Sequence, residues 1–378
     1  MEQDLASTQV PPQSLRMRFL GWRNCVLASR GFQRFAARNP VLRPIARRRA
    51  AALFDLVAGF TYSQTLFAVV ESGLLERLEA GPALLGQIET VTKLDAAAAQ
   101  RLLRAAAALD LVEEVEGRWW VLGRHGAALC GNDGAIAMIR HHRLLYADLV
   151  DPLALLADEC RDSTRLARFW KYGAGEGADE VAAEYSQLMA ISQQAVADEA
   201  LAVFPFSDCG SLLDVGGGNG TFLRRIGKAH PQLRVALFDL PDVVALAQTA
   251  FAREDTSKLP TFHAGNFFDD SIPRGYDLIS LVRILHDHDD VPALRLLENI
   301  HRSMTSGARL MIVEPMAKAR GAEAMGDAYF GLYLWAMGSG RPRSASEIQA
   351  MLGAAGFRSS QAVQTHQPIV TSIIIATA

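Results

Sequence analysis

Cysteine is scarce in this 378-residue sequence, and its placement excludes a disulfide framework or a thiolate zinc site. The four cysteines, Cys25, Cys130, Cys160 and Cys209, lie far apart, with no CxxC pair and no histidine at zinc-ligand spacing. The sequence also lacks an unbroken run of eighteen apolar residues, and its N-terminus has no apolar signal core followed by a small-residue cleavage site. We therefore expect a reduced, cytoplasmic protein without a metal.

Acidic residues and lysine are absent from residues 5–54, which contain ten arginines. This segment carries a charge of +10, so the remainder carries −13 within a total of −3. Half of the residues are hydrophobic and 21% are charged, which is a globular composition. A length of 378 residues favours two domains with a tail. We predict a basic arm over residues 1–50, a helical domain over 51–200 and a second domain over 201–378.

The basic arm interleaves aromatic residues with cations until Pro40 and Pro44 interrupt it. Such a pattern suits a segment that lies in a membrane interface, where arginine heads reach anionic lipid and aromatic rings enter the headgroup layer. An arm that packs on a partner subunit explains the pattern equally well. The residues concerned are Phe19, Trp22, Phe32 and Phe35, with Arg16, Arg18, Arg23, Arg30, Arg34 and Arg38.

The segment from Leu53 to about Val203 has mainly helical periodicity. Within it, residues 84–129 show two helices followed by a hairpin at 112–121 that turns on Glu116-Gly117, which is a winged-helix outline. Residues 84–130 contain six acids and five bases, a balance that provides no electrostatic footprint for phosphate. We expect this segment to form a homodimer interface and to bind no nucleic acid. A ligand-sensing regulator is the non-enzymatic alternative.

The last 178 residues alternate strands and helices, which predicts an α/β fold with a parallel, doubly wound sheet. The final strand has no crossover helix of its own and is expected to be an antiparallel insertion or an edge. The predicted strands are 211–215, 234–238, 261–264, 276–282, 309–313 and 369–377, and the helices lie near 220–230, 242–252, 291–305 and 344–355.

A glycine-rich turn over residues 216–220 follows the first of these strands directly. Glycines there permit positive φ and close approach of a ligand at the carboxyl end of the strand. Thr221 stands where a dinucleotide-binding turn has its third glycine, which favours a nucleoside without a pyrophosphate. Asp239 ends the second strand, where an acid accepts hydrogen bonds from ribose hydroxyls. A structural turn and a helix-capping aspartate are the alternatives.

Five ordered strings together resemble the plant-type class I O-methyltransferase family, from about residue 50 to the end. They are LLDVGGGNGTFL, FDLPDVV, GNFFDDSIPRGYDLISLVRILHDHDD, GARLMIVEPM and GSGRPRSASEIQAMLGAAGF. Within that family the sequence looks most similar to the purple-bacterial enzymes that methylate the 1-hydroxyl of acyclic carotenoids, on the spheroidene and spirilloxanthin pathways. The resemblance implies a Rossmann-like catalytic domain, a winged-helix-like dimerisation domain and S-adenosylmethionine as cofactor.

By this resemblance, Gly216 and Gly218 approach the methionine end of the cofactor, Asp239 holds the ribose, and the GNFF turn at residues 265–268 flanks adenine. The other cofactor-binding residues implied are Asp214, Leu240, Phe267 and Arg283. Four positions depart from the family pattern. Asn266 replaces aspartate, Val282 replaces lysine, His288 replaces tryptophan, and Pro342 replaces a carboxylate beside the catalytic base.

His286 follows a strand end and matches the family's catalytic base, and Glu314 matches the carboxylate that orients it. A neutral imidazole is a natural acceptor for a hydroxyl proton. The alternative is a solvated HDHDD loop, and we assign its Asp289 and Asp290 to capping the next helix. Metal binding by this loop is disfavoured, because it lacks distant ligands.

A hydrophobic small molecule is the expected acceptor, because large, soft side chains gather in two segments that the family brings over the methyl donor. Plain core packing is the alternative for them. A tetrapyrrole of the bacteriochlorophyll type and a polyketide phenol are the alternative acceptors, and peripheral contact with an inner or photosynthetic membrane is expected through the arm. The pocket candidates are Met189, Met325, Tyr329 and Trp335, together with Phe330, Tyr333 and Met337.

Overall fold

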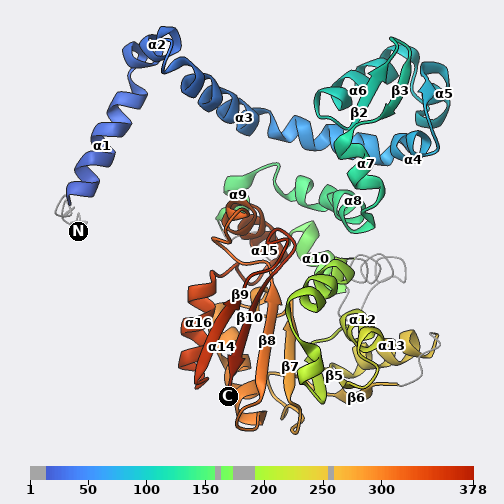
Figure 1. The fold of residues 1–378 in the computed structure, drawn as a ribbon, viewed down its shortest axis with the longest axis vertical. Helices are drawn as coiled ribbons and strands as arrows, with labels where there is room; N and C mark the ends of the chain where they lie inside the picture. The colour runs from blue at the N-terminus through green and yellow to red at the C-terminus, as the bar shows by residue number, and fades with distance from the viewer. Residues whose placement is uncertain (1–13, 158–162, 173–191, 254–258) are drawn as a thin grey trace, which may run out of the picture. The chain divides into compact units, whose positions relative to one another are not determined.

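The computed structural model describes residues 14–157, 163–172, 192–253 and 259–378. The chain forms two compact units, Met1–Arg124 and His125–Ala378 (Figure 1). The predicted pocket residue Met189 and the cysteine Cys160 lie outside the described residues.

The basic arm is helical in the first unit. Ser14 and Ser29 cap its first two helices with their hydroxyls, and Asn39 ends the second by accepting hydrogen bonds from two following amides. Pro44 does not interrupt the third helix, because it lies in the first turn, where no amide donor is needed. That helix runs without a break through residue 50. The three helices are α1 (Leu15–Ala28), α2 (Arg30–Arg38) and α3 (Arg43–Glu71).

The rest of the first unit is a helical module with a small antiparallel sheet in the order β1-β3-β2. The predicted hairpin is present, with Val112 paired to Leu122 and positive φ at Glu116 and Gly117. Its elements are α4 (Leu74–Glu79), β1 (Ala83–Leu84), α5 (Leu85–Thr92), α6 (Ala96–Ala108), β2 (Val112–Val115) and β3 (Trp119–Leu122).

The second unit begins with helices and continues into a seven-stranded sheet in the order β6-β5-β4-β7-β8-β10-β9. The preceding helices are α7 (Arg124–Cys130), α8 (Asp133–Asp148), α9 (Pro152–Leu156), α10 (Arg165–Tyr172) and the helical residues 192–203, followed by the 3₁₀ turn η1 (Phe206–Asp208). The strands are β4 (Ser211–Val215), β5 (Arg234–Asp239), β6 (Thr261–Ala264), β7 (Leu278–Val282), β8 (Arg309–Glu314), β9 (Ser359–Val363) and β10 (Ser372–Thr377).

The doubly wound prediction is confirmed, because the strands from β6 to β8 in this order pair in parallel. The final strand β10 is antiparallel and inserted between β8 and β9, so it is not an edge. The edge strand β9 was not predicted, because its sequence SSQAV is mostly polar and exposed. The flanking helices are α12 (Thr221–Ala229), α13 (Pro241–Ala252), α14 (Asp290–Ser303) and α16 (Ala345–Ala354).

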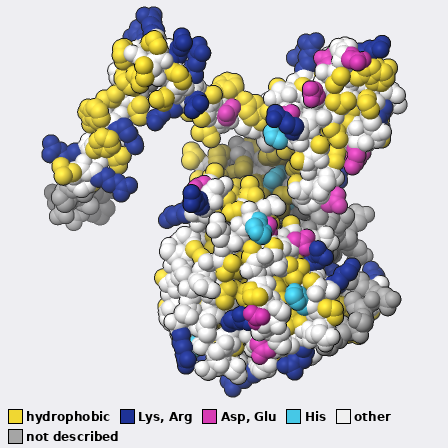
Figure 2. Space-filling view, in the orientation of Figure 1, with side chains coloured by type: hydrophobic (Ala, Val, Ile, Leu, Met, Phe, Trp, Pro, Cys, Tyr) yellow, Lys and Arg dark blue, Asp and Glu magenta, His cyan; other side chains and the backbone are white. Residues whose placement is uncertain are grey.

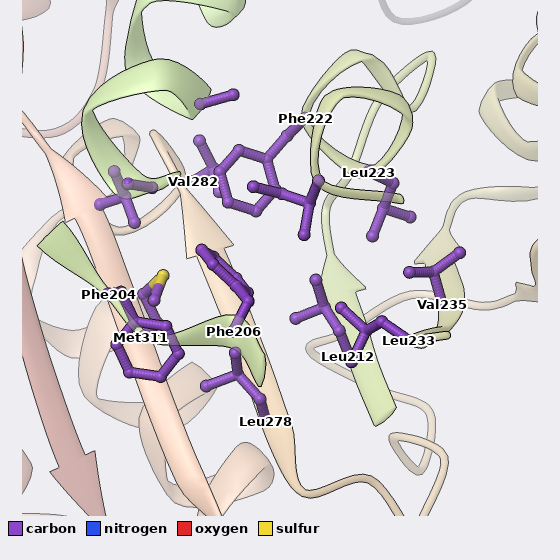
Figure 3. Packing of buried hydrophobic residues seen from close by; sticks show 14 of the residues in the cluster. Phe204, Phe206, Leu212, Phe222, Leu223, Leu233, Val235, Leu278, Val282 and Met311 are labelled. Carbon is purple, nitrogen blue, oxygen red and sulfur yellow. The ribbon is translucent and has the colours of Figure 1, made fainter. Parts of the chain in front are cut away.

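Both faces of the sheet are covered, so its central strands are buried along their length. Leu212 of β4 packs into one apolar cluster with Phe206 and Phe222 (Figure 3), while Leu213 of the same strand belongs to the cluster on the other face. This double burial fixes the register of β4, and with it the point at which the glycine-rich turn emerges.

Candidate active site

The glycine-rich turn emerges from the buried strand β4 and leads into α12. Gly216 and Gly218 have φ of 72° and 58°, a conformation that other residues rarely adopt. A Cβ atom added to Gly218 would meet nothing within 4 Å, so the backbone there faces open space. A ligand can therefore approach the main chain at the carboxyl edge of the sheet.

Asp214, the fourth residue of β4, lies fully buried beneath this turn. Its Oδ1 accepts a 2.6 Å hydrogen bond from the Ser280 hydroxyl, while Oδ2 is buried without a hydrogen-bond partner. Burial raises the pKa of Asp214 to about 7, although the Ser280 bond acts in the opposite direction. A buried acceptor next to an open glycine backbone fits a ligand that brings hydrogen-bond donors or positive charge.

Asp239 joins the two loops that follow β4 and β5. Its Oδ2 accepts from the Gly218 amide at 2.8 Å, and its Oδ1 accepts from the Leu240 amide at 2.7 Å. Burial raises the pKa of Asp239, and these two amide bonds partly offset the effect. The N-cap position of α13 is Leu240, so Asp239 is not the cap of that helix. The carboxylate thus positions the glycine turn at the place where a ribose is expected.

Asn266 is engaged within its own turn. Its Oδ1 accepts from the Phe268 amide at 3.0 Å, and its Nδ2 donates to Asp269 at 2.9 Å. The side chain therefore shapes the segment that carries Phe267, a ring that lies beside His288 with centroids 5.7 Å apart.

His286 lies in the 3₁₀ turn η2 (Leu285–Asp287) after β7 and is buried. Its Nε2 is 3.0 Å from Asp287 Oδ1, and its Nδ1 is 4.0 Å from Glu314 Oε2. Glu314 ends β8, is fully buried, and accepts the His286 backbone amide at 3.0 Å. Both His286 Nδ1 and Glu314 Oε1 are buried without a hydrogen-bond partner. The structure thus brings the predicted pair together through the backbone and leaves two polar atoms for a ligand.

The charges around His286 shift its pKa upward from the ordinary histidine value. Burial lowers the pKa of His286, but the carboxylates of Asp287 and Glu314 raise it, and the net direction is upward. The sequence motifs do not single out Asp287, because the family pattern shows only that Pro342 replaces a carboxylate beside the base. Asp287 supplies the second negative charge beside the imidazole. Adjacent side chains rarely face each other, and His286 and Asp287 do so only because both lie in the tight turn η2.

Arg283 immediately follows β7, is half-buried and has a positive φ of 56°. Its Nη1 donates to the Ser192 hydroxyl at 2.9 Å, whereas its Nε is buried without a partner. Burial lowers the pKa of Arg283, and Asp287 acts in the opposite direction. An arginine with a free buried donor fits an anionic ligand group.

The HDHDD loop is fixed by the turn over residues 338–344, whose sequence GSGRPRS begins the last of the five strings. The guanidinium of Arg343 is fully buried and donates to the carbonyls of Leu285 and His288, at 2.9 and 2.7 Å, and to Asp290 Oδ1 at 2.8 Å. The Arg341 amide donates to the carbonyl of His286 at 3.0 Å. A Cβ atom at Gly340 would collide with that carbonyl, so only glycine allows this approach.

The prediction that Asp289 and Asp290 cap α14 through their side chains is wrong. Asp289 occupies the N-cap position but makes no side-chain cap, and its Oδ1 instead accepts from the Gly340 amide at 3.1 Å. Asp290 binds Arg341 and Arg343. The nearby arginines and amide of the 338–344 turn compete successfully for both carboxylates.

Aromatic side chains from a π-helical turn, η3 (Met325–Phe330), lie beside the histidine. Phe330 stacks on His286 with ring centroids 6.1 Å apart, and Tyr329 bonds His142 of α8 at 2.7 Å. π-Helical turns are frequent at functional sites. Met325 begins this turn, while Trp335 of α15 (Gly331–Met337) packs near Leu155 and donates to its carbonyl at 2.8 Å.

No cluster of potential metal ligands occurs among the residues that the structure describes.

Comparisons with known proteins identify the family. An O-methyltransferase domain model matches residues 148–358, and an O-methyltransferase dimerisation domain model matches residues 54–129. The chain belongs to the O-methyltransferase family. It is 42% identical to a demethylspheroidene O-methyltransferase of Rhodobacter capsulatus, over 90% of this chain and 85% of that protein. It is 40% identical to the enzyme of the same name from Cereibacter sphaeroides, over 92% of both chains.

Solved structures agree with this assignment. The SAH-bound form of CalO1, a methyltransferase in calicheamicin biosynthesis, has a TM-score of 0.72 and 27% identity, covering 87% of this chain and 98% of that one. Human N-acetylserotonin methyltransferase in complex with SAM has a TM-score of 0.71 at 23% identity, covering 87% and 97%, and shows the fold. This O-methyltransferase therefore uses S-adenosylmethionine, and its dimerisation domain supports a homodimer.

Proposed function

We propose that this O-methyltransferase methylates a hydroxyl of a long apolar acceptor, the tertiary 1-hydroxyl of an acyclic carotenoid. The observation that carries the proposal is the likeness to two demethylspheroidene O-methyltransferases over at least nine-tenths of this chain. The aromatic surroundings of His286 support it, because Phe330 and Tyr329 offer apolar surface beside the candidate base.

Asp214, Gly218, Asp239 and Arg283 are the residues that would hold the cofactor. The unpartnered Asp214 Oδ2 and Arg283 Nε are available to its charged groups. When bound, S-adenosylmethionine supplies a methyl group activated by its sulfonium. The chain then has to align the acceptor oxygen with that methyl group, exclude water and receive a proton.

His286 is the proposed proton acceptor. Its Nε2 is held by Asp287, which leaves Nδ1 with the available lone pair. In the transfer, the acceptor oxygen would bond to the methyl carbon while the bond from that carbon to the sulfonium sulfur breaks, and the neutral thioether would be the leaving group. The proton of the acceptor hydroxyl would pass to Nδ1 of His286, and the carboxylates of Asp287 and Glu314 would stabilise the resulting imidazolium. A tertiary alcohol is a weak acid, so we place this proton transfer together with C–O bond formation rather than before it.

Turnover with a labelled methyl donor tests the acceptor. We expect transfer to acyclic carotenoids that carry a tertiary hydroxyl, and none to the same chains without it. A panel that includes bacteriochlorophyll intermediates and polyketide phenols distinguishes the alternatives. Transfer only to a tetrapyrrole or a phenol would overturn the carotenoid assignment and leave the methyltransferase activity intact.

Substitution of the base tests the mechanism. His286→Ala should retain cofactor affinity but lose about 10²–10⁴-fold in turnover, the usual size of general-base assistance. Glu314→Gln should lose less, and the double variant should be little worse than His286→Ala because the residues act together. His263→Ala, which removes a half-buried histidine from β6, is the matched control. Near-normal turnover of His286→Ala would exclude the histidine as base.

We also propose that the second subunit covers the apolar face of α3. By length and composition alone this helix could cross a membrane, and only 11% of its most apolar window is buried, so it is not a core helix of its own unit and its apolar face needs a partner. Leu56 and Phe60 are 82% and 73% exposed within the range of the dimerisation model. Leu56→Glu should weaken the dimer in sedimentation equilibrium, whereas Ala51→Glu, an exposed position on the opposite side of α3 from Phe60, should not. An unchanged dimer would refute this interface.

A further inference from the structure

The basic arm, defined here as residues 14–50, displays its charge without any acidic residue to balance it. All ten of its arginines are exposed, and they lie on α1, α2 and the first turns of α3. Figure 2 shows dark blue and yellow side chains interleaved along these helices. A surface of this kind attracts a strongly anionic partner.

Helix α1 combines this charge with an exposed apolar stripe. Leu15, Phe19 and Trp22 are spaced by four and three residues, so they share one face, and they are 83%, 59% and 64% exposed. The two rings lie 5.9 Å apart. At about 100° per residue, Arg16 and Arg18 fall on opposite sides of this stripe. Arginines that flank an apolar face can keep their heads in the headgroup layer while the rings enter it.

Helix α2 repeats the arrangement. Arg30, Arg34 and Arg38 are four residues apart and form a cationic row along one face, while Phe35, on another face, is 56% exposed. Ala36 is buried, so part of the apolar face already packs within the arm, where α2 contacts α3. The exposed ring and the arginine row are left for a partner outside the arm.

We propose that the arm is a docking surface for the headgroup layer of an anionic lipid bilayer. A bilayer satisfies both halves of the surface, since it offers negative charge to the arginines and an apolar layer to the rings. A nucleic acid would use the charge but leave the apolar stripe of α1 in water. The arm of a second copy would bring ten further positive charges against the first.

Membrane docking would benefit this enzyme if its acceptor is a long apolar molecule, so this inference rests on the proposed function. A long apolar acceptor dissolves in a bilayer and not in water, so an enzyme held at the surface meets its acceptor where that acceptor is concentrated. Lipid binding by the arm can be measured without any acceptor. A negative result for lipid binding would therefore leave the proposed acceptor untouched, and a different acceptor would leave lipid binding untouched.

Vesicle flotation of the full chain provides the test. We expect it to float with vesicles containing phosphatidylglycerol, to float poorly with pure phosphatidylcholine, and to be released by salt. The triple variant Arg30→Gln, Arg34→Gln, Arg38→Gln should bind roughly 100-fold more weakly, on the basis of the usual contribution of each basic residue near such a surface. The pair Phe19→Ser, Trp22→Ser should also weaken binding, with charge unchanged.

The matched control removes the same charge from exposed positions outside the arm, with Arg101→Gln, Arg104→Gln and Arg118→Gln. It should float like the unmodified chain. The proposal is overturned if this control weakens binding as much as the arm variant, because net charge alone would then be responsible. It is also overturned if the arm variants alter the oligomeric state but not flotation, or if the arm binds duplex DNA in preference to the anionic vesicles.

Discussion

Arg343→Lys should slow methyl transfer far more than it weakens cofactor binding. The buried guanidinium serves two loop carbonyls, those of Leu285 and His288, and the Asp290 carboxylate. An ammonium group has three donors on a compact centre and cannot reproduce this planar fork. We therefore expect at least one carbonyl that flanks His286 to lose its donor, which makes Arg343 a positioning residue.

The size of both effects follows from these contacts. One or two lost charge-assisted bonds correspond to a loss of about 2–5 kcal/mol in the free energy of unfolding. A displacement of His286 by about 1 Å is enough to reduce turnover about 100-fold. The cofactor turn is held separately, by the bond between Gly218 and Asp239, so its affinity should change by no more than about twofold.

The assay combines denaturant unfolding, calorimetric titration of the cofactor and the pH dependence of kcat. Arg341→Lys is the control, because its half-exposed side chain pairs with Asp290 and Glu347 near the surface, where such pairs contribute about 0–1 kcal/mol. If Arg343→Lys stays folded with normal kcat and an unchanged pH profile, the positioning role is refuted. Equal losses in both variants would refute it as well.

Three further substitutions test the charges of the site. Asp239→Ala should weaken cofactor binding by about 1.5–3 kcal/mol in calorimetry, because a charged acceptor is lost. Asp287→Asn should move the acid limb of the kcat profile to lower pH, because that carboxylate raises the pKa of His286 and the base must be neutral to act. Asp214→Asn should stabilise the cofactor-free protein at pH 8 by a few kcal/mol, measured by denaturant unfolding.

The sign for Asp214 follows from its raised pKa. The folded protein holds this proton up to a pKa of about 7, whereas the unfolded chain releases it near 3.8, so the native protein loses stability as pH rises between these values. The asparagine variant lacks this dependence, and an unchanged stability profile would contradict the burial argument.

For the Asp239 variant, unchanged cofactor affinity would remove Asp239 from the binding site. For the Asp287 variant, a shift of the acid limb to higher pH would contradict the role of Asp287.

The strands and the glycine turn were predictable because their signals are local. An unbroken apolar run such as β4 specifies a strand buried on both faces, and glycines at its end specify the turn. The polar edge strand β9 has no such signal, since its pairing with β10 depends on an element that follows it in the chain. The helices of the arm were described from sequence only as a basic, aromatic segment.

The sequence by itself determined which strand ends hold the polar residues of the site. These residues are Asp239, His286 and Glu314. Their meeting at one edge follows from parallel pairing. Only the tertiary structure decided the partners of these groups. Asp287 faces the imidazole because η2 is tightly wound, and Arg343 reaches the loop from more than fifty residues away. Such contacts depend on long-range packing, which local periodicity does not encode.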